Sequence, residues 1–211
     1  MARAARHRRS YDRRAPNREP YDTILIVCEG EKTEPNYFKG LITACRLSGA
    51  RIKVMHPPAT DPMSLVQFGE TQLGNHDRVF CIFDRDGNDE GFRQAVRKIE
   101  NSEAGRAGRF HAITSVPCFE LWVLLHFRYT TAPFTAVGRA SACQRVLNAV
   151  REHLPDYAKG DGEIYRWIEP RTNAALRHAN RLEAERAGTA FDNPSTRMHR
   201  LVEYLRTLKQ N

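Results

Sequence analysis

Short runs of consecutive apolar residues alternate with segments of helical spacing along the first half of the chain. The clearest runs are residues 23–28, 78–83 and 110–114, which are rich in β-branched and aromatic side chains. They lack the apolar–polar alternation of a half-exposed strand, and such continuous runs are typical of strands that a parallel sheet buries on both faces. A shorter run at residues 51–55 is a further strand candidate. We therefore expect four strands.

Segments with apolar residues at helical spacing separate these strands. Residues 35–45, 62–73 and 91–100 each place their apolar side chains on one helical face. Asp61 and Pro62 suit an N-cap and the first helical residue that follows it. Strands that alternate with helices predict a parallel sheet with right-handed crossovers. The pattern therefore predicts an α/β fold, with a Rossmann-like, mostly parallel four-stranded sheet and flanking helices.

The alternation ends after the fourth strand, and the rest of the chain reads as helical. We expect helices over residues 119–126, 140–153, 171–187 and 195–208, with an irregular stretch at 129–137. The whole pattern divides the chain into three parts. These are a basic disordered tail (1–20), an α/β core (21–130) and a helical C-terminal extension packed on the core (131–211).

Composition limits the class of protein. A length of 211 residues and a hydrophobic content of 41% suffice for one sizeable core. No run of about 18 apolar residues is present, and the arginine-rich N-terminus lacks the apolar segment of a secretory signal. The five cysteines form no C-x-x-C pair, which argues against a zinc site and a disulfide framework. We therefore expect a cytoplasmic protein that makes no membrane contact.

The formal net charge of +8 is concentrated in the tail, where seven arginines face Asp12 and Glu19. Arginine suits bidentate contacts with phosphates, and such contacts need charge density but no fold. The tail is therefore a candidate nucleic-acid contact, although a solubilising tail and a docking arm for a protein partner remain alternatives. The tail residues chosen as nucleic-acid contacts are Arg6, Arg8, Arg9, Arg13 and Arg14.

Two acidic clusters directly follow predicted strands. Glu29, Glu31 and Glu34 follow the first strand, whereas Asp84 and Asp86 follow the third. Functional groups gather at the carboxyl ends of parallel strands, so the clusters are expected to converge. Converging carboxylates oppose one another's ionisation, and a divalent cation such as Mg²⁺ would offset that repulsion. The alternative is that these acids cap helices or form a turn.

Three further residues are candidates near the same edge. Glu120 lies in an apolar segment, where an unpaired charge is costly. It is either a buried carboxylate with a local partner or a catalytic residue that orients water or metal. Lys32 and Arg85 are candidate phosphate contacts, although each also suits a structural role. No G-x-x-x-x-G-K-[ST] sequence is present, so the chain is not a P-loop ATPase.

The strand sequences and the acids that follow them resemble the Toprim pattern of topoisomerases, primases and certain nucleases. In that pattern a glutamate follows the first strand and a D-x-D follows a later one, which here are Glu29 and Asp84-Arg85-Asp86. The resemblance implies that Asp84 and Asp86 hold Mg²⁺, or Mn²⁺ as an alternative. It also implies that Glu29 completes the metal site or manages a proton, and that the fold is Toprim-like.

A longer set of motifs resembles the RloB family. The motifs are residues 27–38 (VCEGEKTEPNYF), 83–86 (FDRD), 117–122 (PCFELW) with 126–127, and 193–196 (NPST). This resemblance implies an antiphage setting in restriction-linked or abortive-infection loci, with a partner ATPase of the AAA or ABC type encoded nearby.

The resulting hypothesis is a Mg²⁺-dependent endonuclease that cleaves phosphodiesters of RNA, such as tRNA, or of DNA. A non-catalytic regulatory subunit that binds nucleic acid or the ATPase is the main alternative, and a primase or nucleotidyl transferase is a weaker one. The substrate and the oligomeric state, including a homo-oligomer, stay open.

Overall fold

A computed structural model describes residues 22–47, 52–58, 61–85, 87, 89–189 and 192–208 of the chain. The predicted basic tail, with Arg6, Arg8, Arg9, Arg13 and Arg14, lies outside the described residues, and so does Asp86. Within the described residues, no helix is long and apolar enough to cross a membrane.

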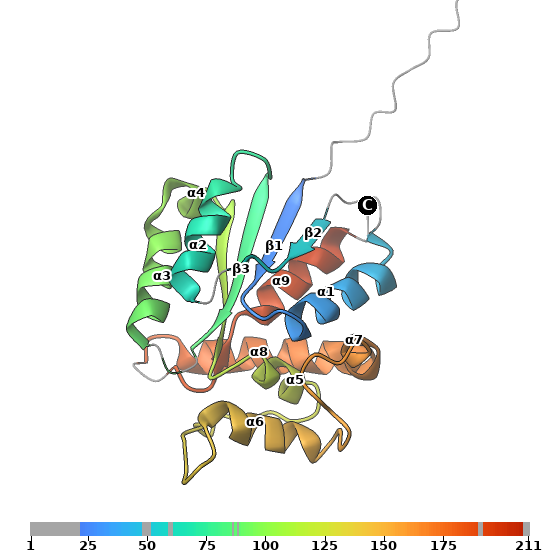
Figure 1. Cartoon of the computed structure of the whole chain (residues 1–211). Helices are drawn as coiled ribbons and strands as arrows, with labels where there is room; N and C mark the ends of the chain where they lie inside the picture. The colour runs from blue at the N-terminus through green and yellow to red at the C-terminus, as the bar shows by residue number, and fades with distance from the viewer. Residues whose placement is uncertain are drawn as a thin grey trace, which may run out of the picture.

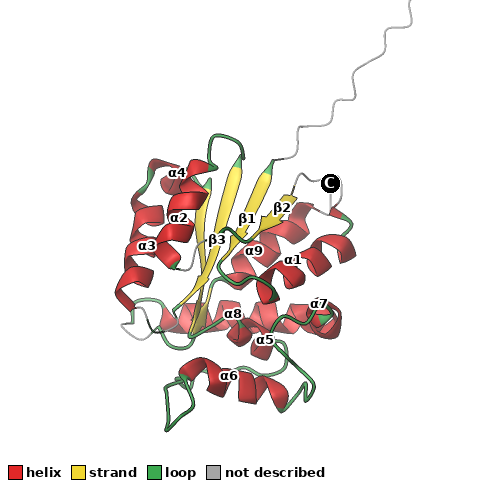
Figure 2. Cartoon of the chain, viewed as in Figure 1, coloured by secondary structure: helices red, strands yellow, loops and turns green. Residues whose placement is uncertain are grey.

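The fold is built on a five-stranded sheet in the order β2-β1-β3-β4-β5 (Figure 2). β1 (Ile24–Cys28) pairs in parallel with β2 (Ile52–Met55) on one side and with β3 (Arg78–Asp84) on the other. β4 (Phe110–Val116) continues the parallel sheet, and β5 (Ser195–Thr196) closes it as a short antiparallel strand. The predicted parallel strands are confirmed, and β5 is an addition that the sequence pattern did not reveal.

Alternate residues of the central strands feed two separate cores, one on each face of the sheet. Ile24 and Ile26 pack on one face, whereas Leu25 and Val27 pack on the other, and all four are fully buried. Both faces of β1 are therefore apolar, which is why its sequence shows a continuous run rather than alternation.

Helices cover both faces (Figure 1). One face is covered by α2 (Pro62–Thr71), α3 (Asp89–Asn101) and α4 (Glu103–Arg106). The core of the other face includes side chains from α1 (Thr33–Ala44), α5 (Glu120–Leu125), α6 (Ala142–Arg151), α7 (Ile164–Ile168), α8 (Thr172–Arg186) and α9 (Met198–Thr207). A 3₁₀ turn, Glu169–Arg171, joins α7 to α8.

Local sequence signals account for several boundaries. Asp61 caps α2 as predicted, because its Oδ1 accepts hydrogen bonds from the amides of Met63 and Ser64, both at 3.0 Å. The helix expected over residues 195–208 begins later, at Met198, because Ser195–Thr196 extends along β4 instead. The boundary drawn at residue 130 stays a prediction, although helices from beyond it share a core with β1.

Candidate functional site

Four buried or half-buried acidic side chains, together with the exposed Glu31, line one cleft of about 540 Å³. Glu29 directly follows β1, Asp84 is the last residue of β3, and Glu120 is the first residue of α5. Glu34 comes from the first turn of α1. The predicted convergence at the carboxyl edge of the sheet therefore occurs for Glu29, Asp84 and Glu120, and Glu34 joins them.

Two hydrogen bonds link the strand ends that carry these acids. The amide of Asp84 donates to Oε2 of Glu29 at 3.0 Å, and the amide of Phe119 donates to Oδ2 of Asp84 at 2.9 Å. Each carboxylate thus accepts a hydrogen bond from the backbone of the next acidic segment. This arrangement fixes Glu29 and Asp84 on rigid strand ends and places Glu120, the residue after Phe119, beside them.

Gly30 leaves the space that Glu34 occupies. A Cβ atom at Gly30 would collide with the carboxylate of Glu34. Because only glycine lacks that atom, the E-G-E-x-x-E sequence lets the side chain of Glu34 fold back over the loop that follows β1. The result is a buried Glu34 carboxylate, with only 7% of the residue exposed.

The loop between α6 and α7, which belongs to the C-terminal part of the chain, closes one side of the cleft. The amide of Gly160 donates to Oγ1 of Thr33, and Nδ2 of Asn36 donates to the carbonyl of Gly160, both at 2.9 Å. Gly160 has a φ of +83°, a conformation that other residues rarely adopt. These contacts fasten the loop to the start of α1.

The fastened loop supplies partners for Glu120. Nζ of Lys159 lies 3.3 Å from Oε2 of Glu120, and the hydroxyl of Tyr157 donates to Oε1 at 3.4 Å. Glu120 is only 2% exposed, and its Oε2 accepts no hydrogen bond of good geometry among the described residues. The ion pair with Lys159 therefore compensates a buried charge without satisfying its oxygen fully.

Burial and mutual repulsion act together on the acids of the cleft. Burial raises the pKa of Glu34 to about 7, and the neighbouring Glu120 and Glu29 contribute to the increase. Burial also raises the pKa of Asp84 well above its usual value, with further contributions from Glu34, Glu120 and Glu29. Burial disfavours the charged form of Lys159, but the carboxylate of Glu120 outweighs this and raises the pKa of Lys159.

The chemistry of the cleft fits a hard divalent cation. Five carboxylates and two lysines line it, so negative charge is in excess, and carboxylate oxygens are the ligands that Mg²⁺ prefers. A bound cation would favour the ionised carboxylates that burial now disfavours. Among the described residues, no three Asp, Glu, His or Cys side chains lie close enough together to form a metal site as they stand. Asp86, which the sequence assigned to the metal, lies outside those residues.

The other candidate residues lie apart from one another. Lys32 is exposed at the mouth of the cleft. The side chain of Arg85 points elsewhere, since it pairs with Asp192 at 2.7 Å and with Asp89 at 3.1 Å. His126, from the motif at residues 126–127, is not a cleft residue but a buried core residue. Its Nδ1 lies 2.9 Å from the carbonyl of Trp122, and burial lowers its pKa to about 4.

Sequence reasoning missed the residues that come from the α6–α7 loop. Lys159, Gly160 and Tyr157 lie far along the chain from the acidic motifs, and no spacing connects them with Glu29 or Asp84. The only local signal is the Gly160-Asp161-Gly162 sequence, which indicates a tight turn but not its partner.

The fold and the cleft together define an α/β protein with helices on both faces of its sheet and converging carboxylates at the carboxyl edge. A family described as RloB-like protein matches residues 24–205, so the chain belongs to the RloB-like protein family. This confirms the resemblance seen in its motifs. Searches of the curated proteins and of the solved structures returned no match.

Proposed function

We propose that this chain is a Toprim-type, metal-dependent endonuclease that hydrolyses phosphodiester bonds of RNA or DNA. The observation that carries the proposal is the convergence of Glu29, Glu34, Asp84 and Glu120 in one open cleft. Burial, together with the neighbouring carboxylates, raises the pKa values of Glu34 and Asp84, so a cation in the cleft would favour their ionised forms. A divalent cation together with a phosphodiester is a natural complement to such a site.

Asp84 and Glu29 would hold the cation, together with Asp86, which follows Asp84 by two residues. When bound, Mg²⁺ or Mn²⁺ would neutralise charge on the phosphoryl oxygens and on the leaving oxygen. The amide hydrogen bonds from Asp84 to Glu29 and from Phe119 to Asp84 already fix these side chains. Little reorganisation is then needed when substrate arrives, which favours catalysis.

Glu120 and Lys159 supply the remaining chemistry. Glu120 is held by Lys159 and Tyr157 and faces the cleft, where it can orient a water molecule and accept its proton. Lys159 and the exposed Lys32 bring positive charge to the position of the substrate phosphate. Hydrolysis consumes one water and leaves one phosphomonoester end and one hydroxyl end.

Family membership motivates the biological setting of this proposal. We infer that the nuclease acts as an effector of antiphage defence and that a partner ATPase of the AAA or ABC type, encoded nearby, controls it. Because the ATPase would restrain or trigger cleavage, activity assays should be run with and without it.

The test is incubation of the purified chain with labelled total RNA and with plasmid DNA, in Mg²⁺ and in EDTA, alone and with the ATPase. We expect cleavage in Mg²⁺ only, and a loss of at least about 100-fold in Asp84→Asn, with cooperative thermal unfolding showing that the variant still folds. Asp156→Asn is the matched control, since Asp156 is exposed next to Tyr157 but does not line the cleft. Full cleavage by Asp84→Asn would contradict the proposal.

Thermal unfolding with increasing Mg²⁺, alongside the cleavage assay, distinguishes the nuclease from the main alternative. A metal site stabilises the native state by about 1.4 kcal/mol for each tenfold excess of metal over its dissociation constant, and Asp84→Asn should remove that stabilisation. If Mg²⁺ neither stabilises the chain nor supports cleavage under any of these conditions, a non-catalytic subunit that binds nucleic acid or the ATPase is the better description.

A further inference from the structure

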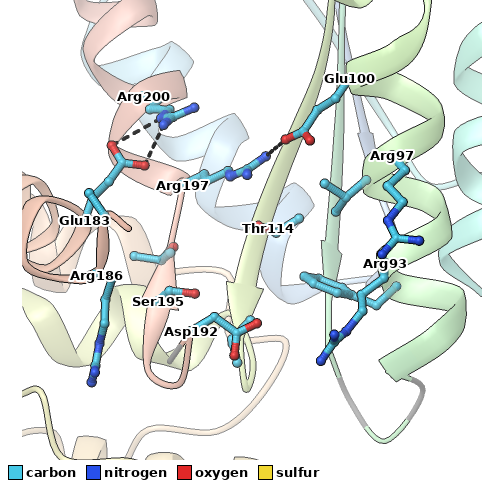
Figure 3. A pocket seen from close by; sticks show the side chains of 15 residues that line it. Arg93, Arg97, Glu100, Thr114, Glu183, Arg186, Asp192, Ser195, Arg197 and Arg200 are labelled. Atoms are coloured by element: carbon cyan, nitrogen blue, oxygen red, sulfur yellow. Dashed lines mark hydrogen bonds and ion pairs between the residues drawn. The ribbon is translucent and has the colours of Figure 1, made fainter. Parts of the chain in front are cut away.

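A second hollow of about 550 Å³ lies at the carboxyl end of β4. Its walls are α3 on one side and the segment from Asp192 to Arg197 on the other (Figure 3). That segment contains Ser195 and Thr196, so the NPST sequence at 193–196 builds one wall. Asn193 anchors the segment, because its side chain exchanges two hydrogen bonds with the backbone of Phe134, at 3.1 and 2.7 Å.

The charges that line this hollow are mostly arginines. Five arginines and three carboxylates contribute to its walls. Each of the three carboxylates already pairs with an arginine. Glu100 lies 2.9 Å from Arg197, Glu183 lies 2.6 Å from Arg200, and Asp192 lies 2.7 Å from Arg85. Positive charge is therefore in excess, and each carboxylate of the walls is already paired with an arginine.

Three of the five arginines, Arg93, Arg97 and Arg186, pair with no carboxylate among the described residues. Arg93 and Arg97 lie one helical turn apart on α3, and both line the hollow (Figure 3). Among the described residues, neither makes an ion pair or a side-chain hydrogen bond. Arg186 faces them from α8, held by its hydrogen bonds to the carbonyls of Thr131 and Asn193 at 2.6 and 3.3 Å. Two guanidinium groups on one turn of a rigid helix are suited to bidentate contacts with phosphate oxygens.

The arginine hollow adjoins the acidic cleft through consecutive residues. Asp84 lines the cleft, and the next residue, Arg85, pairs with Asp192 in the wall of the hollow. The amide of Arg85 also donates to the carbonyl of Ser115 at 3.1 Å, which fixes Arg85 beside β4. A strand of nucleic acid that reached the cleft from this side would therefore pass the arginines first.

We propose that the arginine hollow binds backbone phosphates of a single nucleic-acid strand, with Arg93 and Arg97 as the contacting residues. This inference rests on the proposed function, because it gives the nuclease a site for the part of the strand that flanks the cleaved bond. Binding of the flanking phosphates fixes the register of the strand relative to Asp84 and Glu29. Phosphate contacts carry no sequence information, so the hollow contributes affinity and position rather than sequence preference.

The test is binding of fluorescent single-stranded RNA and DNA oligonucleotides in EDTA, which removes metal and prevents turnover. We expect Arg93→Ala/Arg97→Ala to weaken binding about tenfold or more at about 0.1 M salt. The slope of log K against log salt should flatten by about 0.7 for each phosphate that the variant no longer neutralises. Arg106→Ala/Arg109→Ala is the matched control, since both arginines are exposed at the opposite edge of the sheet, just before β4.

Equal weakening in the two double variants, no weakening in either, or a wild-type chain that binds neither oligonucleotide would overturn the proposal. The binding measurement can succeed or fail independently of the nuclease proposal. If the wild-type chain cleaves nothing but Arg93→Ala/Arg97→Ala binds selectively less, the hollow stands and the nuclease fails. If cleavage occurs, the double variant should raise KM by a larger factor than it lowers kcat.

Discussion

Two hollows of similar size lie along the carboxyl edge of the sheet, and their charges are opposite. The cleft at the ends of β1 and β3 has five carboxylates and two lysines, whereas the hollow at the end of β4 has five arginines and three carboxylates. In the cleft, the carboxylates converge, and burial raises the pKa values of Glu34 and Asp84 and so opposes their ionisation. In the arginine hollow, every carboxylate has an arginine partner, whereas Arg93, Arg97 and Arg186 pair with no carboxylate among the described residues.

The difference in charge follows from the way in which the strands end at this edge of the sheet. The parallel strands bring the acids of neighbouring turns together, and that crowding favours a cation. The antiparallel β5 turns the chain so that the start of α9 and the end of α8 face α3, and this brings arginines from distant segments together. A polyanion with a bound divalent cation complements both hollows at once.

The largest effect is expected from removing the buried charge of Glu120. Glu120→Gln should lower cleavage by at least about 100-fold, because the amide can neither accept a proton from water nor balance Lys159. Single-turnover cleavage of labelled substrate measures this. Glu152→Gln is the control, since Glu152 is exposed and lies outside the cleft. If activity survived while the melting temperature fell, the ion pair between Glu120 and Lys159 would be structural. The difference in charge between the two hollows would then no longer support a catalytic role for Glu120.

The pKa of Glu34 predicts how stability changes with pH in metal-free buffer. The folded carboxyl group has a pKa of about 7, raised from an ordinary value of about 4.5, so the folded state holds its proton more tightly than the unfolded state. Stability is therefore full below about pH 4.5 and falls as pH rises towards about 7. Glu34→Gln should remove this fall and be more stable than wild type by roughly 3 kcal/mol at about pH 8, but not at about pH 4.

Chemical denaturation in EDTA at those two pH values checks this prediction. Saturating Mg²⁺ should reduce the difference at the higher pH, because the cation supplies the charge that the carboxylates lack. Parallel stability curves for wild type and Glu34→Gln would mean that other groups of the protein already balance the negative charge of the cleft. The cleft would then have no excess negative charge for a cation to neutralise.

An intermediate effect on stability is expected from a substitution in the loop between α6 and α7, which closes the cleft. Gly160→Ala should destabilise the chain by about 1–2 kcal/mol, because alanine is strained at a φ of +83° and its Cβ would lie 3.1 Å from that of Lys32. Gly162→Ala is the matched control, since its Cβ would meet no atom within 4 Å. Thermal unfolding of both variants checks the prediction, and equal effects would show that the loop does not depend on the contacts of Gly160.

Most of the sheet could be predicted because strands buried on both faces leave a continuous apolar run. β1, β3 and β4 follow that rule, and the acids at their ends follow from the direction of parallel strands. β5 could not be predicted, because two residues have no period and their pairing with β4 depends on a segment about 80 residues away.

Prediction from the sequence met the same limits for the residues of the acidic cleft and for those of the arginine hollow. Glu29, Asp84 and Glu120 were predicted because each lies at, or directly next to, the end of an element that the hydrophobic pattern shows. Lys159 was missed because the loop that carries it has no period. Arg93 and Arg97 occupy the polar face of an amphipathic helix, where arginines usually contact only water, so their role depends on the tertiary position of β5.

The smallest effect concerns Asp192, which joins the two hollows through Arg85. Asp192→Asn should cost less than about 1 kcal/mol of stability, because Asp192 is half exposed and solvent screens its ion pair. It removes a negative charge from the wall of the arginine hollow, so oligonucleotide binding in EDTA should tighten by roughly twofold to fivefold and depend more steeply on salt. Glu163→Gln makes the same charge change at an exposed pair with Arg166, far from α3 in the sequence. If both variants tightened binding equally, overall charge alone would explain the affinity, whereas a selective effect of Asp192→Asn places the strand beside Arg85, one residue from the acidic cleft.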